Sequence, residues 1–156
     1  RLEHEPSEEE LKSAIGDPKK FKEVVFCGYG EPLQRLDTVK NIARWVHEMG
    51  GVVRINTNGH GNIIHKRNIL PELRGIVDSI SISLGALDEE TYNRICKPAF
   101  TNAFSEILQF IRQAREAIPE VVITVVTMEG VDIDKCRVIA EELGVPLRIR
   151  KLDVVG

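Results

Sequence analysis

Five short apolar segments, each separated from the next by a stretch with helical spacing, constrain the fold of this chain more than any other feature. Strands that alternate with helices are typical of a parallel sheet joined by right-handed crossovers. We expect strands at residues 23–27, 52–56, 76–84, 121–127 and 147–152. The sequence therefore predicts a single α/β domain over residues 1–156 with a five-stranded parallel sheet. Both an open doubly wound sheet and an arc of a barrel fit this order of elements.

The predicted helices begin and end at residues that commonly cap helices. Ser7 followed by Glu10 forms a capping-box pattern, and Gly16 follows the last apolar residue of that helix. Apolar residues at helical spacing predict further helices from about residue 37 to 49, in part of 62–73, and at 88–95, 102–118 and 134–143. No internal repeat or linker divides the sequence.

Several of the predicted strands alternate polar and apolar residues. Because side chains in a strand point to opposite faces in turn, one face would be apolar and the other polar. An unpaired arginine is costly to bury, so the polar face must meet water, other polar groups or a ligand. This pattern predicts a partial (β/α) barrel with helices on the outer face and a polar concave face; for the arginines of the last strand, a solvated edge is the alternative. The polar positions are Arg54, Asn56, Ser79, Ser81, Ser83, Arg148 and Arg150.

Composition excludes several classes of function. A formal net charge of −3 gives no support for general binding of nucleic acids. No apolar run approaches the roughly 20 residues that span a bilayer, so we expect no membrane partner. The three cysteines, Cys27, Cys96 and Cys136, have no metal-ligand spacing, and their odd number argues against a disulfide framework. We therefore expect a cytoplasmic, reducing environment.

The first predicted strand runs into Gly28-Tyr29-Gly30-Glu31-Pro32. Glycines let the backbone approach a ligand closely, and Glu31 would lie at the carboxyl end of the strand, where parallel α/β folds bind ligands. A carboxylate held there suits a ligand ammonium group. The alternative is a tight strand-to-helix turn with a solvated Glu31.

Motifs in the expected order resemble those of the radical S-adenosylmethionine (SAM) enzymes. Residues 28–33 have the form of the Gly-Gly-Glu-like element of activating-enzyme-like members, and Thr57-Asn58-Gly59 resembles the turn after their third strand. Residues 81–84 and 88–95 resemble the fourth strand and its following loop. The resemblance covers the whole chain, as strands two to six of the family barrel, and is nearest to the TatD-associated, activating-enzyme-like group.

The resemblance implies that the chain binds SAM and an unknown substrate. Glu31 and the carbonyls near Gly30 would receive the SAM ammonium group, and Gly28 and Tyr29 of the same turn would also bind the cofactor. Asn56, Thr57 or Ser83 would contact the ribose, and Val125 and Val126 would pack against adenine. Arg54, Arg148 or Arg150 would neutralise the SAM carboxylate or a substrate anion. His60 and His65, which follow the Thr-Asn-Gly turn, are further candidates. In the intact enzyme, a reduced [4Fe–4S] cluster would cleave SAM to a 5′-deoxyadenosyl radical that removes a hydrogen atom from the substrate.

The departure from the family concerns the cluster. Its Cys-x-x-x-Cys-x-x-Cys loop does not occur in these 156 residues, and such clusters need thiolate ligands. We therefore predict no metal ligand and no catalytic residue here, and we expect the loop upstream of Arg1 in a longer, intact protein. Cys27 falls inside a predicted strand, which favours a buried structural thiol.

Two further hypotheses stay open. In the first, the intact protein is a radical SAM enzyme, and this chain alone is inactive because it lacks the cluster loop. It could instead be a non-catalytic α/β barrel-like module that binds a carboxylated or phosphorylated metabolite. Without the family's first strand, one sheet edge would be unpaired, which suggests a homodimer through that edge.

Overall fold

All five strands belong to one parallel sheet in the order β1-β2-β3-β4-β5. Each strand therefore lies beside its predecessor in the chain, with no reversal of order. Such a sheet is an arc of a singly wound barrel rather than a doubly wound sheet. The computed structural model, which describes residues 6–27, 30–84, 90, 102–127 and 132–151, thus confirms the predicted partial barrel. The strands are β1 (Val24–Phe26), β2 (Val53–Thr57), β3 (Ser79–Ser83), β4 (Glu120–Thr127) and β5 (Leu147–Lys151).

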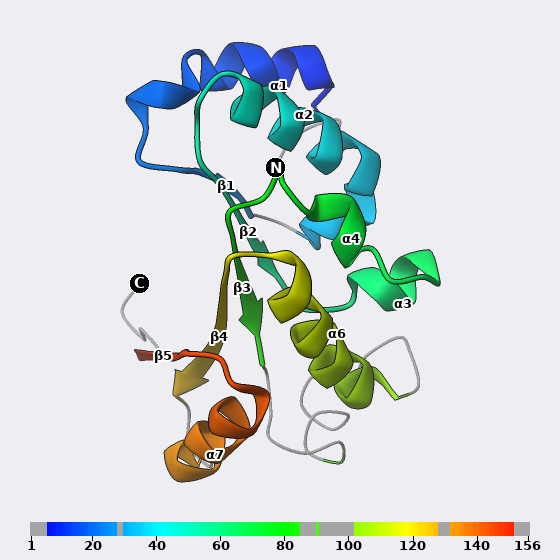
Figure 1. The fold of residues 1–156 in the computed structure, drawn as a ribbon, viewed down its shortest axis with the longest axis vertical. Helices are drawn as coiled ribbons and strands as arrows, with labels where there is room; N and C mark the ends of the chain where they lie inside the picture. The colour runs from blue at the N-terminus through cyan, green and yellow to red at the C-terminus, as the bar shows by residue number, and fades with distance from the viewer. Residues whose placement is uncertain (1–5, 28–29, 85–89, 91–101, 128–131, 152–156) are drawn as a thin grey trace.

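The helices follow one another along one side of the sheet, from α1 and α2 at the top of Figure 1 to α7 at the bottom. The predicted capping box is present, because Ser7 Oγ accepts from Glu10 N at 3.2 Å and Glu10 Oε1 accepts from Ser7 N at 3.4 Å. No helix in the described part of the chain is long and apolar enough to cross a bilayer. The α-helices are α1 (Glu8–Ile15), α2 (Leu36–Glu48), α3 (Gly61–His65), α4 (Leu70–Leu73), α6 (Ala103–Ala117) and α7 (Ile133–Leu143), and the 3-10 helices are η1 (Pro18–Lys20) and η2 (Pro32–Arg35).

One predicted helical segment contains two helices, and another lies mostly outside the described residues. The stretch 62–73 divides into α3 and α4, and Pro71 lies in the first turn of α4, where its missing N–H removes no helical hydrogen bond. The segment predicted at 88–95 lies outside the described residues apart from Glu90.

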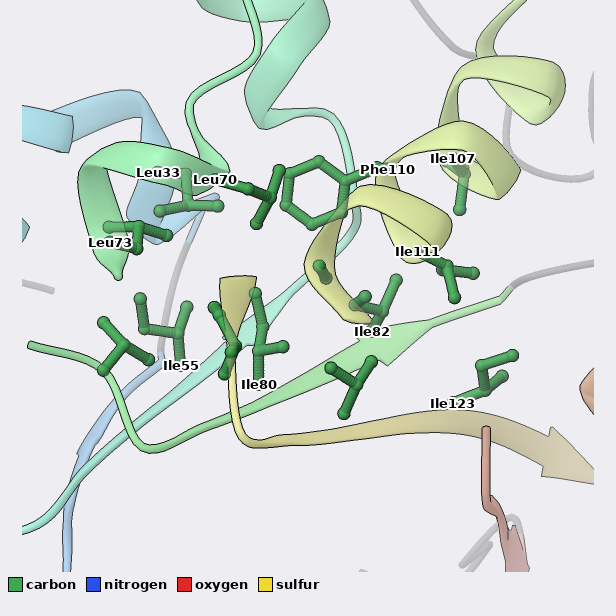
Figure 2. Packing of buried hydrophobic residues seen from close by; sticks show 14 of the residues in the cluster. Leu33, Ile55, Leu70, Leu73, Ile80, Ile82, Ile107, Phe110, Ile111 and Ile123 are labelled. Atoms are coloured by element: carbon green, nitrogen blue, oxygen red, sulfur yellow. The ribbon is translucent and has the colours of Figure 1, made fainter. Parts of the chain in front are cut away.

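The core lies between the sheet and α6. Figure 2 shows apolar side chains of the strands facing apolar side chains of α6, with leucines of η2 and α4 closing one end. Every labelled residue in this view is at most 1% exposed. Burying a side chain of this size contributes roughly 1.5–3 kcal/mol, so this layer dominates the stability of the arc. The residues are Leu33, Ile55, Leu70, Leu73, Ile80, Ile82, Ile107, Phe110, Ile111 and Ile123.

A charge cluster ties α4 and the loop before it to α2. Glu72 accepts from Lys40 Nζ at 2.9 Å, and from Arg67 Nε at 2.9 Å and Nη2 at 3.0 Å. These hydrogen bonds, first from Arg67 and then from Lys40, lower the pKa of Glu72 from 4.5 to about 2. The carboxylate therefore stays ionised in the folded state at a pH where an unpaired glutamate is protonated.

This shift predicts acid-dependent stability. Because the folded-state pKa is the lower one, the stabilisation is fully present above pH 4.5 and is lost as the pH falls towards 2. The cluster is partly exposed to solvent, which reduces its expected contribution to about 1 kcal/mol at pH 7. Urea unfolding of Glu72→Gln should show that loss at pH 7 and a flatter decline below pH 4.5 than the wild type.

Glu48→Gln is the matched control, since Glu48 is exposed at the end of α2. It should unfold with the pH profile of the wild type. An acid decline in Glu72→Gln as steep as that of the wild type would contradict the assigned role of this cluster.

Candidate ligand-binding site

The carboxylate of Glu31 joins the carboxyl ends of β1 and β2. Its Oε1 accepts from Thr57 Oγ1 at 2.5 Å and from Leu33 N at 3.2 Å, and its Oε2 accepts from Asn58 N at 2.8 Å. An ionised carboxylate accepts about four hydrogen bonds, two at each oxygen. The described residues therefore leave one acceptor position open, on Oε2.

The local sequence explains how Glu31 reaches this place. Gly30 has φ +80°, a left-handed conformation that glycine adopts without strain. Glu31 then caps η2, and Pro32 supplies the fixed φ of its first turn. Glu31 is thus half-buried and hydrogen-bonded rather than solvated, and no sequence pattern indicates its bonds to the turn after β2.

The turn after β2 is organised by its own side chains. Thr57 Oγ1 accepts from Gly59 N at 3.1 Å while it donates to Glu31, and Asn58 Oδ1 accepts from His60 N at 2.9 Å. Thr57 is only 3% exposed and belongs to the helix-covered face of the sheet. Its hydroxyl is committed to the protein, which corrects the expectation that Thr57 contacts a ribose.

The two histidines after this turn have different surroundings. His65 Nε2 lies 2.6 Å from the carbonyl oxygen of Leu33, so it supports η2 and, through that helix, the position of Glu31. His60 is half-buried, and desolvation lowers its pKa, so the imidazole is neutral at pH 7. His65 therefore has a structural role behind Glu31.

The open face of the sheet is the face opposite the helices. Paired charges occupy its amino end. Arg54 forms ion pairs with Glu23 at 3.2 Å and with Glu120 at 3.5 Å, and it donates to Ser81 Oγ at 3.0 Å. Its register partner in β3 is Ser79, whose buried Oγ has no hydrogen-bond partner among the described residues. Arg54 is thus occupied far from the carboxyl edge and does not serve as the free cation that the sequence allowed.

The carboxyl half of the open face carries exposed polar groups. Asn56 is in register with Ser81, Ser83 with Thr124, and Thr124 with Arg148. Partners in parallel strands project to the same face, and Asn56, Ser83 and Arg148 are all exposed. The structure therefore brings three of the predicted site residues to one face.

Val125 and Cys27 do not lie where we expected them. Val125 is 4% exposed and packs in the core under the helices, so it cannot line the open face. Cys27 follows the end of β1 and is exposed, which corrects the prediction of a buried thiol. Gly28, Tyr29 and the side chain of Val126 lie outside the described part of the structure.

The residues present do not fit an iron–sulfur cluster. No group of three or more histidine, cysteine or acidic residues in the described part of the chain is arranged to hold a metal ion. The three cysteines of the sequence do not form the expected three-cysteine loop. The residues do fit SAM, because an anionic acceptor and exposed polar groups share the carboxyl side of the sheet.

The fold is a partial (β/α) barrel, an architecture in which ligands bind at the carboxyl ends of the strands. The family model of the Radical SAM superfamily matches residues 1–143. The chain therefore belongs to the radical SAM superfamily, whose cofactors are SAM and a [4Fe–4S] cluster.

Among solved structures, the chain is similar to a domain of a pyruvate-formate lyase-activating enzyme from Bacteroides vulgatus ATCC 8482. The TM-score is 0.55 at 16% sequence identity, and the match covers 83% of this chain and 99% of that one. At this identity the likeness supports the fold of the barrel. A comparison with curated protein sequences found no match.

The bond from Thr57 to Glu31 predicts a stability effect. Thr57→Val keeps the shape of the side chain but removes the donor to Glu31 and the acceptor for Gly59 N. Leaving these partners unpaired should lower the free energy of unfolding by about 1–2 kcal/mol, measured by urea denaturation. Thr38→Val in α2 is the matched control and should change it by less than about 0.5 kcal/mol. Equal midpoints for the two variants would contradict the anchoring role of Thr57.

Proposed function

We propose that this chain is the SAM-binding portion of a radical SAM enzyme. The single observation that carries the proposal is the carboxylate of Glu31, fixed at the carboxyl edge of the sheet with one acceptor position open. The family match and the partial-barrel fold support it.

Glu31 is suited to receive the SAM ammonium group. A hydrogen bond between an ammonium and a carboxylate is charge-assisted and stronger than a neutral one. Because three hydrogen bonds already hold the carboxylate, little side-chain entropy is left to lose when a ligand arrives. The negative charge also disfavours a phosphate at this edge, which argues against the alternative of a phosphate-binding module here.

Asn56 is the residue best placed for the ribose. Its exposed amide lies on the open face of the strand that ends beside Glu31, and an amide offers both donors and an acceptor to vicinal hydroxyl groups. Ser83 faces the same side on the neighbouring strand β3, two residues beyond Ser81, the register partner of Asn56. Thr57 acts differently, because it positions Glu31 instead of contacting the ligand.

The chemistry of the family divides into two parts. SAM bound beside a reduced cluster supplies the radical that removes a hydrogen atom from substrate. The residues of this chain would bind SAM and orient it at the carboxyl edge of the sheet. Because the 156 residues contain no three-cysteine loop, we expect them to bind SAM without cleaving it.

Calorimetry of the Glu31→Gln variant tests this proposal. The amide retains one oxygen for the protein's own hydrogen bonds but removes the charge that attracts the ammonium. Affinity for SAM, and for S-adenosylhomocysteine, which keeps the amino group, should fall about tenfold, equivalent to about 1.4 kcal/mol.

Glu23→Gln is the matched control, because Glu23 pairs with Arg54 at the opposite end of the sheet. It should bind both ligands as the wild type does. If Glu31→Gln keeps wild-type affinity while remaining folded, Glu31 does not form the ammonium site.

A further inference from the structure

We propose that Arg148 and Thr124 form an oxyanion subsite that receives a carboxylate or phosphate group of the substrate, and not the carboxylate of SAM. The inference rests on the proposed function, because it takes the SAM ammonium group to lie at Glu31. It names the substrate class of the same open face: a molecule that carries an anionic group.

The strand register places the two side chains together. Thr124 of β4 and Arg148 of β5 are partners in the ladder, so they project to one face. Leu147 packs against the core, which directs its neighbour Arg148 to the open face. Thr124 Oγ1 donates to Ser83 Oγ over 3.4 Å, a long hydrogen bond that a better acceptor can replace.

Arg148 also differs from Arg54 in its partners. Arg54 is held by two carboxylates, whereas Arg148 is exposed and forms no hydrogen bond or ion pair with the described residues. A guanidinium has five donors in a planar fork that matches a carboxylate or a phosphate. Arg148 therefore has its full donor capacity available to an incoming oxyanion.

The width of the sheet separates this subsite from the SAM carboxylate. The ammonium and carboxylate groups of SAM are bonded to one carbon, so they must reach the protein at the same place. Glu31 lies at the ends of β1 and β2, and β5 is three strands away from β2, on the order of 14 Å measured along the curved sheet at the usual strand spacing. An extended arginine side chain covers about half of that span. Arg148 thus meets a different anion.

The separation has a consequence for the reaction. A substrate anchored by its anionic group at Arg148 would extend back across β4 and β3 towards the nucleoside near Asn56. Fixing a reactant at a set position makes a reaction between bound partners much faster than one between freely diffusing partners. The subsite would therefore select substrates both by charge and by the distance from the charge to the reacting carbon.

The test uses the whole chain and two probe anions, inorganic phosphate and acetate, each titrated at constant ionic strength. Backbone amide shifts in 15N NMR spectra report binding. We expect saturable shifts around Thr124 and Arg148 in the wild type, and at least tenfold weaker binding in Arg148→Gln. Arg112→Gln is the matched control, because Arg112 is exposed on α6, which covers the other side of the sheet, and it should bind as the wild type does.

S-adenosylhomocysteine binding is measured on the same variants and separates the two proposals. Arg148→Gln should bind it within twofold of the wild type. A tenfold loss there would assign Arg148 to the SAM carboxylate and overturn the inference, as would anion shifts that are equal in Arg148→Gln and Arg112→Gln. A failure of Glu31→Gln to weaken S-adenosylhomocysteine would instead overturn the proposed function, because the anion titration does not involve Glu31. A response to only one of the two anions still supports the subsite and identifies the group it takes.

Discussion

The three hydrogen bonds accepted by the carboxylate of Glu31 are the constraint on which the rest of the site depends. They connect η2, which follows β1, to the turn that follows β2, and so they fix the edge of the sheet where we propose that SAM binds. Hydrogen bonds to a charged acceptor contribute roughly 1.5–3 kcal/mol, more than those between neutral groups. Such bonds are strong enough to hold Glu31 in one conformation after the left-handed Gly30. His65 adds to this arrangement, because it bonds the carbonyl of Leu33 behind the same turn.

The charged groups along the carboxyl side of the sheet differ in sign from β1 to β5. A carboxylate with an open acceptor lies at the carboxyl ends of β1 and β2, and two exposed arginines, Arg148 and Arg150, lie on β5. Between them the strands carry small neutral groups, Ser81, Ser83 and Thr124. The charges at the amino end are already paired around Arg54 and do not compete for a ligand. A ligand with a cationic and an anionic end would therefore have one preferred orientation on this face, and two separate ligands would each have a preferred place.

The sequence predicted the strands, their parallel arrangement and the end of the sheet that carries Glu31, because these follow from short-range periodicity. It did not predict the bonds from Glu31 to Thr57 and Asn58, which join residues 26 and 27 positions apart. It placed Asn56 and Thr57 in one role, although adjacent residues of a strand point to opposite faces. For Val125 the sequence pattern does not indicate which face of the sheet the side chain joins, because residues 121–123 and 125–126 are all valine or isoleucine. Only the fold decides which of them face the helices. Cys27 was assigned to a buried strand, but β1 ends at Phe26 and leaves the thiol exposed.

The hydrogen bonds to Glu31 indicate how the two tasks of the family, binding SAM and holding the cluster, can be separated. Within the described residues, the partners of this carboxylate are Leu33, Thr57 and Asn58, and none of them is a residue that could hold a cluster. The proposed receptor for the ammonium group is therefore preorganised by the sheet itself. Preorganisation keeps the entropic cost of binding low whether or not a cluster is present. It follows that the affinity of these residues for SAM measures the part of the binding free energy that the barrel supplies, apart from any part contributed by direct ligation to iron.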